Sequence, residues 1–465
     1  MDVLAMGKGG VGTGLTPDGQ PAHIRWAPPG GRVAVLPFGR KKGIWQGRRT
    51  ELLRKPPGYT EPRCSLFALC GGCALQELDL PTQRQVKQQF ALAQLGDLEG
   101  VQIQPVRGAD EAYSYRNKVE FSFGSARYLS EAAHAAEETI EGRWLGFHAP
   151  GRWDRIVDAE RCDLVSEAAN AVLAEARRLT LTDSSPPPWN PRSHTGFWRH
   201  LVLRQGFATD QLLAIVYTNE PADSEADAVH ELAKALMALE LPDSVSLVGV
   251  VWGTNAQVAD VARGTTQQIW GRGTLTEKLG PVTFELSPTS FFQTSTTGAV
   301  VLYDAIGEAL GDAKGTCYDL YCGIGTIGQY LAHRFDRIVG VEERPESIED
   351  AKRNAAANGL TDVEYTASRM EKALHLLPAS QEAAGDTVLV VDPPRAGLHP
   401  KAATALAGAR ADVLIYVACN PASLGRDRVV LEAGGWTLKA VWTVDLFPQT
   451  GHIELIGRFE REPVG

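Results

Sequence analysis

Several features are absent from this sequence of 465 residues, and each absence excludes a class of protein. No apolar run reaches the length of a membrane-spanning helix, and the N-terminus has no basic stretch followed by an apolar one, so neither membrane contact nor secretion is predicted. No internal repeat or low-complexity tract is present. Positive charge is not in excess, because the net charge is −10, and this argues against general binding to polyanions. We therefore expect a cytoplasmic protein that contacts nucleic acid only through local surfaces.

The composition that remains is that of a globular protein with more than one domain. Hydrophobic residues make up 44% of the chain and charged residues 22%, as in ordinary soluble domains. A chain of this length is too long for a single core. Between Arg40 and Arg63, eight Lys and Arg residues stand against two Glu, and Trp45 and Tyr59 lie among them. A basic stretch is most often a solvated surface, but the interleaved aromatic residues favour RNA binding.

The seven cysteines fall into two groups. In a cytoplasmic chain they are not expected to form disulfides. Cys64, Cys70, Cys73 and Cys162 lie in the N-terminal half, the first three close together around a pair of glycines. Thiolates in this pattern can hold either an iron–sulfur cluster or a zinc ion, and the spacing alone does not choose between them. The others are Cys317 and Cys322, expected to be core thiols, and Cys419.

The C-terminal part of the sequence alternates helices and strands, which predicts an α/β fold with a doubly wound parallel sheet. A helix is expected over 297–310, and strands are expected over 316–321, 337–342, 388–391, 412–417 and 453–459. In such sheets ligands bind in a crevice at the carboxyl ends of the strands. Residues that follow these strands are therefore candidates for a site.

Reactive or glycine-rich residues do follow several of the strands. A glycine-rich loop, 319–328, can approach a ligand closely, and Glu342 lies about 20 residues after it, where an acidic side chain can bind ribose hydroxyls. The two prolines after Asp392 fix a turn that leaves its carboxylate pointing out of the strand end. Cys419 lies just past the strand 412–417. A free cysteine is usually a small buried residue, but a position between a strand and a helix start can lower its pKa and make it a nucleophile.

The N-terminal half has a different character. Residues 1–60, with glycine-rich turns and short apolar strands, predict a small β-barrel, and the glycine run 7–14 lacks the Lys and Ser/Thr of a phosphate-binding loop. Further along, the patterns predict a helix over 82–95, a strand over 113–123 that carries Arg116 and Lys118, a proline-rich loop over 183–192 and a helix over 226–241.

Five short motifs occur in a fixed order towards the C-terminus. They are SFFQ at 290–293, DLYCGIGTIG at 319–328, DPPR at 392–395, ACNPASLGRD at 418–427 and HIE at 452–454. Together they resemble the S-adenosylmethionine-dependent RNA uracil-5-methyltransferase family. The resemblance implies three domains: a Rossmann-like methyltransferase domain over 286–465, a central α+β domain with RNA-facing strands over 61–285, and an OB-like TRAM barrel that binds RNA over 1–60.

The resemblance also implies roles for single residues. Cys419 is expected to add to carbon 6 of a uracil, and Glu454 is expected to remove the proton from carbon 5. The positions expected to bind S-adenosylmethionine are Gln293, Tyr321, Gly323, Gly325, Thr326, Glu342 and Asp392. Cys64, Cys70, Cys73 and Cys162 resemble the ligands of a 4Fe–4S cluster in the cluster-bearing branch, which is similar to bacterial 23S rRNA methyltransferases. The expected partner is RNA, with ribosomal RNA favoured over transfer RNA, and the protein is expected to be a monomer.

Two other functions stay open at this point. An amino-group methyltransferase of nucleic acids would use the same cofactor crevice without a nucleophile, but its motif would end in an aromatic residue where this chain has Arg395. An electron-transfer or RNA-binding module would use the thiols and carry a degenerate methyltransferase half. Every motif position that can be checked is filled, which argues against degeneracy.

Overall fold

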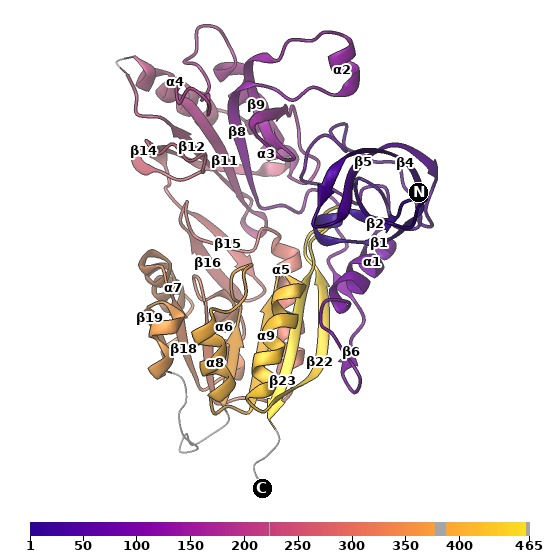
Figure 1. Ribbon diagram of the computed structural model, residues 1–465. Helices are drawn as coiled ribbons and strands as arrows, with labels where there is room; N and C mark the ends of the chain where they lie inside the picture. Colours follow the sequence, from indigo (N-terminus) through magenta and orange to yellow (C-terminus); the bar gives the residue numbers. More distant parts are fainter. Residues whose placement is uncertain (223, 377–386, 462–465) are drawn as a thin grey trace.

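In the computed structural model, which describes residues 1–222, 224–376 and 387–461, the strands form four sheets. Figure 1 places the N-terminal sheet beside α1 (Leu80–Leu92), the central sheet at the top and the C-terminal sheet at the bottom, with a hairpin of β15 (Leu275–Leu279) and β16 (Val282–Leu286) between the two larger sheets. No helix in these described ranges is long and apolar enough to span a membrane.

The N-terminal sheet closes on itself. Its strands are β1 (Val3–Met6), β2 (Gly12–Leu15), β3 (Pro21–Arg25), β4 (Arg32–Lys41) and β5 (Ile44–Arg54), in the order β1-β2-β3-β5-β4. The two ends of this order meet, because Asp2 and Arg32 form an antiparallel bridge and the amide of Val33 donates to the carbonyl of Met1 at 2.9 Å. Val3, Ile24 and Val33 fill the small core inside.

The central sheet carries helices on one face. Its order is β10-β9-β8-β11-β12-β13-β14. The strands are β8 (Lys118–Ala126), β9 (Glu141–Ala149), β10 (Arg152–Asp158), β11 (Trp198–Gly206), β12 (Gln211–Thr218), β13 (Ser246–Thr254) and β14 (Thr265–Gly271), and the helices are α2 (Glu131–Ala135), α3 (Glu167–Thr180) and α4 (Glu225–Met237). Val172 of α3 and Leu232 of α4 pack with Phe121 in one core.

The strand predicted over 113–123 begins later than expected, because β8 starts at Lys118.

The C-terminal sheet has the order β19-β18-β17-β20-β21-β23-β22-β6, with β7 also paired to β22. Its strands are β6 (Gln102–Ile103), β7 (Arg107–Gly108), β17 (Thr316–Leu320), β18 (Arg337–Glu342), β19 (Val363–Ala367), β20 (Thr387–Val391), β21 (Val413–Ala418), β22 (Trp436–Asp445) and β23 (Glu454–Arg461). The associated helices are α5 (Thr296–Leu310), α6 (Thr326–Tyr330), α7 (Pro345–Ala357), α8 (Pro400–Gly408) and α9 (Pro421–Ala433).

Both faces of this sheet are buried, as a doubly wound sheet requires. Alternate residues of one strand belong to different cores: Val388 and Val390 pack on the side of α5, whereas Leu389 and Val391 pack on the side of α8. This explains why the strands read as continuous apolar runs rather than as alternating patterns. The predicted mixed α/β architecture is confirmed.

The prediction that the sheet is parallel throughout is wrong at one edge. Strands β17 to β21 are parallel, but β23 lies antiparallel between β21 and β22. The loop 446–453 that joins β22 to β23 is short, so these two strands form a hairpin, and a hairpin is necessarily antiparallel. The first residue of β23 therefore lies at the same edge of the sheet as the last residue of β21.

Residues 80–108 attach to the C-terminal sheet, although the predicted boundaries place them in the central domain. β6 and β7 pair with β22, and Lys87 of α1 is fully buried against the same strand. The Lys87 ammonium donates to Asp445 Oδ1 at 2.7 Å and to the Phe447 carbonyl at 3.0 Å. Burial lowers the pKa of Lys87, and the contact with Asp445 opposes that shift.

This buried ion pair yields a prediction about stability. Lys87→Met leaves the Asp445 carboxylate buried without its cation, so we expect the free energy of unfolding to fall by roughly 3 to 5 kcal/mol in urea denaturation. The double variant Lys87→Met with Asp445→Leu removes both charges and should recover most of that loss. A double variant as unstable as the single one would show that packing, not charge, sets the stability here.

Candidate active site

Cys419 and Glu454 lie at the same end of one strand pair. In the antiparallel pair of β21 and β23, the last paired residues are Ala418 and Leu455. Cys419 follows Ala418 and Glu454 precedes Leu455, so both residues stand just beyond this pair. Glu454 raises the pKa of the Cys419 thiol, which places the two side chains near each other. The structure therefore brings together the two residues for which the sequence predicted catalytic roles.

Asp392 and Tyr321 lie at the same edge of the sheet. Leu320 is in register with Val391, and Val391 with Tyr416, so the residues after these strands emerge side by side. The amide of Asp392 donates to the Leu320 carbonyl at 3.3 Å. These strands run parallel, and their carboxyl ends form the crevice expected for a doubly wound sheet.

Two positions of the glycine loop, Gly323 and Gly325, require glycine for different structural reasons. Gly323 has φ 56°, and a Cβ there would have no heavy atom within 4 Å, so this backbone is open to a ligand. Its amide donates to Glu342 Oε2 at 3.2 Å. Gly325 has φ 78°, but a Cβ there would lie 2.6 Å from the Tyr365 hydroxyl. Gly323 therefore fits a cofactor position, whereas Gly325 allows close packing within the loop.

The remaining predicted cofactor residues lie around this loop. Tyr321 adopts φ 64°, a left-handed conformation uncommon for a residue with a side chain, and this turns the chain from β17 into the loop. Thr326 begins α6, and its hydroxyl accepts a hydrogen bond from Tyr303 at 2.9 Å. Gln293 is 9% exposed, and its backbone carbonyl accepts from Asn117 Nδ2 at 2.9 Å.

Two residues outside the predicted set support the site. The buried Asp319 carboxylate accepts from the Gly328 amide at 2.9 Å and so fixes the glycine loop. The Arg395 carbonyl accepts from Asn420 Nδ2 at 3.0 Å, which ties the loop after β20 to the residue next to Cys419. Both residues stand inside the sequence motifs, but their side-chain types gave no signal of these supporting roles.

The expectation that Cys419 has a lowered pKa is wrong for the free protein. Burial, followed by Glu454 and Asp392, raises the pKa of the Cys419 thiol to about 11, and Arg395 opposes the rise. Burial away from water therefore outweighs the effect of the helix start. Cys419 is therefore a neutral thiol at neutral pH until the charge around it changes.

The neighbouring acids are shifted in the same direction. Burial raises the pKa of Glu454 well above its usual value, and Asp392 adds to that rise. Burial, with a contribution from Asp319, raises the pKa of Asp392 to about 7. Burial lowers the pKa of His452 to about 4, so this imidazole is neutral at neutral pH. A cationic ligand at this edge would favour the ionised carboxylates.

A second candidate site lies away from this edge. Cys64, Cys70, Cys73 and Cys162 line one cavity of about 330 Å³, here called the four-thiol cavity. Burial raises the pKa of all four thiols, to about 11 for Cys70 and about 12 for Cys73. Thiols with raised pKa values bind metal by releasing protons. The structure thus brings together the four cysteines that the sequence grouped.

Arg116 belongs to the four-thiol cavity. It lies before β8, and its Nε is buried without a hydrogen-bond partner. The expectation that Arg116 belongs to the strand is wrong, because β8 begins at Lys118 and the Arg116 amide donates to the Leu164 carbonyl at 2.8 Å. A half-buried cation with an unused donor suits an anionic group among the thiols.

Within the described ranges, no group of three His, Cys, Asp or Glu side chains is placed to hold one ion. Four thiolates around one zinc ion each lie about 2.3 Å from it.

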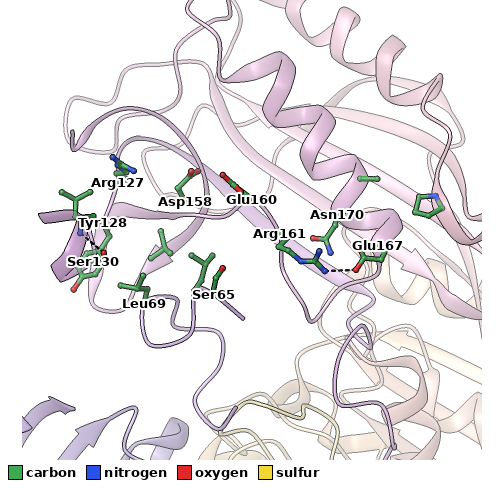
Figure 2. Close-up of a pocket in the computed structure, with 16 residues that line it drawn as sticks. Ser65, Leu69, Arg127, Tyr128, Ser130, Asp158, Glu160, Arg161, Glu167 and Asn170 are labelled. Carbon is green, nitrogen blue, oxygen red and sulfur yellow. Dashed lines mark hydrogen bonds and ion pairs between the residues drawn. The ribbon is translucent and has the colours of Figure 1, made fainter. Parts of the chain in front are cut away.

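A larger cavity of about 800 Å³ adjoins the four-thiol cavity and shares Leu66 and Arg161 with it. Figure 2 shows Tyr128 and Ser130 on one side of this cavity and the ion pair of Arg161 with Glu167, 2.8 Å long, on the other. It contains none of the residues predicted for catalysis or metal binding. Within it Arg161 pairs with Glu167, whereas Arg127 and Asp158 pair with Glu138 and Arg177, which do not line the cavity.

Comparisons with known proteins find relatives that match along most of the chain. The model of the family described as tRNA (uracil-5-)-methyltransferase matches residues 207–459. An RNA methyltransferase of Chlorobaculum tepidum is 34% identical over 440 residues, covering 93% of this chain and 90% of the relative. Another, of Caldanaerobacter subterraneus subsp. tengcongensis, is 32% identical and covers 97% of this chain and 96% of the relative.

The fold is similar to a solved structure along almost its whole length. The crystal structure of Pyrococcus abyssi tRNA (uracil-54, C5)-methyltransferase in complex with S-adenosyl-L-homocysteine matches with a TM-score of 0.72 and 26% identity. The match covers 97% of this chain and 99% of that chain. The likeness therefore extends over the N-terminal and central sheets as well as the C-terminal sheet.

The charge arrangement at the catalytic edge predicts how Cys419 reacts with an alkylating reagent. Because the pKa of this thiol lies near 11, the alkylation rate in the free protein should rise about tenfold per unit between about pH 7.5 and 9.5, without a plateau. Arg395→Gln removes the cation that opposes the rise in the pKa of Cys419, so this variant should be alkylated more slowly. Peptide mass mapping separates Cys419 from the other thiols. A plateau reached below about pH 8 would mean that the thiolate already exists in the free protein.

Proposed function

The chain belongs to the tRNA (uracil-5-)-methyltransferase family and is an S-adenosylmethionine-dependent RNA methyltransferase, and from this we propose that it methylates carbon 5 of a specific uridine in RNA. The observation that carries the proposal is that Cys419 and Glu454 stand just beyond the paired residues Ala418 and Leu455, at the carboxyl edge of the C-terminal sheet, near enough for Glu454 to raise the pKa of the thiol. An amino-group methyltransferase needs neither a thiol nor a base on the far side of the substrate ring.

The crevice fits S-adenosylmethionine by shape and by charge. The open backbone at Gly323 leaves room beside Glu342, whose carboxylate we assign to the ribose hydroxyls. Asp392 and Glu454 are buried acids without a cationic side chain bonded to them among the described residues. When bound, the cofactor supplies a methyl group on a positively charged sulfur. That charge would lower the pKa values of the neighbouring acids and of Cys419.

The first chemical step falls to Cys419. Carbon 5 of uracil is a weak nucleophile, and the Cys419 thiolate activates it by forming a bond to carbon 6. The electrons of the carbon 5 to carbon 6 double bond move towards oxygen 4, which gives an enolate. Carbon 5 then takes the methyl group, and the sulfur of the cofactor keeps the electron pair of the broken bond. The RNA is now joined to the protein, with a hydrogen and a methyl group on carbon 5.

Glu454 completes the reaction. Its carboxylate removes the proton from carbon 5, the double bond to carbon 6 forms again, and the Cys419 sulfur leaves with the electron pair of its bond. Glu454 must be ionised for this step, whereas burial raises its pKa in the free protein. A positive charge on the bound cofactor opposes that rise and so favours the ionised base. The target uridine must be turned out of any stack, because carbon 6 is covered in a duplex.

We further propose that Cys64, Cys70, Cys73 and Cys162 hold a 4Fe–4S cluster rather than a zinc ion. The support is the wide four-thiol cavity and the unpaired Arg116 donor beside it, since a cluster with four thiolates is anionic. The cluster would join the thiol loop, residues 64–73, to the segment around Cys162 in the central region. No electron transfer is needed by the methyl-transfer steps, so the proposed role is structural.

The N-terminal sheet is proposed to be the OB-like RNA-binding barrel, and the domain boundaries 1–60, 61–285 and 286–465 remain part of the proposal. The closed strand order of the N-terminal sheet supports its assignment as a barrel, and two aromatic rings paired with arginines on its surface support RNA binding. Arg40 lies 4.3 Å from the ring centre of Trp45, and Arg25 lies 5.6 Å from that of Phe38.

Ribosomal RNA is the proposed substrate, and transfer RNA is the second candidate because the similar Pyrococcus abyssi structure is a tRNA enzyme. Mapping of 5-methyluridine by mass spectrometry, in both RNA classes from cells with and without the gene, decides between them. A site lost only from transfer RNA would overturn the ribosomal assignment. No change in 5-methyluridine, with methylation lost from an amino group instead, would overturn the proposed reaction.

The two catalytic residues predict different fates for the protein–RNA adduct. Glu454→Gln should form the bond from Cys419 to carbon 6 and transfer the methyl group, and then stall, giving a methylated adduct on a denaturing gel. Cys419→Ala should form no adduct and no product while still binding the cofactor. Cys317→Ala, a buried thiol in β17, is the matched control and should keep turnover. RNA containing 5-fluorouridine should trap the normal protein, and turnover by Cys419→Ala would disprove the nucleophile.

The cluster assignment predicts the metal content of protein purified without oxygen. The protein should be brown, contain iron and absorb broadly near about 400 nm. Cys162→Ser should lose iron and stability, with little change in affinity for the cofactor, because Cys162 follows β10 of the central sheet whereas the glycine loop follows β17 of the C-terminal sheet. Cys322→Ser serves as the control and should keep its iron. Stoichiometric zinc without iron in the anaerobic protein would refute the cluster.

A further inference from the structure

The loop between β22 and β23, residues 446–453, is held by the thiol loop from the other end of the chain. The amides of Ala74 and Leu75 both donate to the Gln449 carbonyl, at 2.8 and 2.9 Å. Ala74 directly follows Cys73, one of the four thiols. The two residues that directly follow the thiol loop therefore bind the loop that leads into β23.

Gln449 is a tightly bonded residue in this contact. Its amide donates to Gln83 Oε1 at 2.7 Å, and Gln83 Nε2 donates back to Gln449 Oε1 at 3.0 Å. Gln449 is 4% exposed and has φ 70°, a conformation that a residue with a side chain keeps only when its surroundings fix it. Gln83 lies on α1, so the helix that follows the thiol loop holds the same point.

Two more contacts fix the same loop. The Tyr115 hydroxyl donates to the Pro448 carbonyl at 2.9 Å, and Tyr115 directly precedes Arg116 of the four-thiol cavity. On the other side, a Cβ at Gly451 would lie only 2.1 Å from the Gly10 amide nitrogen, so the backbones of the N-terminal sheet and the loop are in direct contact. The loop thus takes its position from three segments of the N-terminal half.

The far end of this loop carries the proposed base. The amide of His452 donates to Thr450 Oγ1 at 3.2 Å, and Glu454 follows as the first residue of β23, opposite Val444. A displacement of Gln449 is therefore transmitted over a few bonded residues to the Glu454 carboxylate. Cys419 and the glycine loop are held by other contacts, from Arg395 and Asp319.

We propose that Gln449 is a positioning residue through which the thiol loop, with its cluster, holds Glu454 in place for removal of the carbon 5 proton. This inference rests on the proposed function and gives the cluster a specific task within it. Loss of the cluster would then impair proton removal and release of the RNA, rather than cofactor binding or bond formation by Cys419.

The test separates the two halves of the reaction in single turnover. Gln83→Met removes the side-chain amide that bonds to Gln449. Gln449→Gly removes the side-chain amide of Gln449 and keeps a left-handed backbone, which glycine adopts readily. Each should slow the release of methylated RNA from the adduct about tenfold, with the rate of adduct formation unchanged. Gln88→Met is the matched control, because Gln88 also lies on α1 and bonds to Thr443 of β22 at 2.9 Å, away from Gln449. It should leave both rates unchanged.

Two outcomes of these kinetics overturn the inference. Adduct formation and release falling together in Gln83→Met would indicate general loosening, and an equal effect of Gln88→Met would remove the special status of Gln449. A normal protein that forms no adduct with uridine RNA would instead overturn the proposed function. Hydrogen exchange in the loop that contains Gln449 tests the inference even if no adduct forms.

The role of the cluster is tested by a double-mutant cycle and by hydrogen exchange. If the thiol loop acts through Gln449, Cys162→Ser should slow release in the normal protein but add little in the Gln83→Met background, since coupled residues are not additive. Amide exchange in 446–455 should rise when iron is removed, while exchange in 319–328 stays constant. Additive effects on release, or unchanged exchange in 446–455, would show that the cluster does not act on the base.

Discussion

The catalytic edge is governed by the cost of placing acidic groups side by side away from water. Cys419, Asp392 and Glu454 emerge from neighbouring strand ends, and each is held in its neutral form more firmly than in water. Arg395 offsets part of that cost for Cys419 and Glu454. A cationic ligand offsets more of it, so the same arrangement that keeps the thiol unreactive in the free protein favours a cofactor with a positive charge. Activation and cofactor binding are in this way one electrostatic event.

The N-terminal and C-terminal halves of the chain pack against each other at β22 and at the loop that follows it, instead of forming separate units. Strand β22 receives β6, β7 and α1 from the N-terminal half, and the loop after it is bonded to the thiol loop. The four thiols of the proposed cluster are therefore remote from the methyltransferase motifs in the sequence, but the residues that follow them are bonded to the loop that precedes Glu454. This gives a metal group without a redox task a reason to be present in a methyltransferase.

Much of the site could be predicted because it follows from strand ends. The apolar runs before Asp392 and Cys419 located both residues, and parallel strands bring such ends together whatever the loops do. Long-range contacts could not be predicted: Gln449 meets Gln83 across 366 positions, and no local pattern signals such a pair. The position of Arg116 outside β8 and the antiparallel β23 were missed for the same reason. The pKa of Cys419 was misjudged because the helix start is visible in the sequence, whereas the burial of the thiol and the two acids beside it depend on other strands.

The ion pair of Lys87 with Asp445 spans 358 positions, which has a consequence for synthesis on the ribosome. Chains grow from the N-terminus, and domains generally fold as they emerge. α1 leaves the ribosome long before β22 has been translated, and its lysine has no buried partner until then. The thiol loop likewise waits for Cys162. α1 and the segment before it must therefore remain incompletely packed, and open to chaperones, until the last hairpin is made.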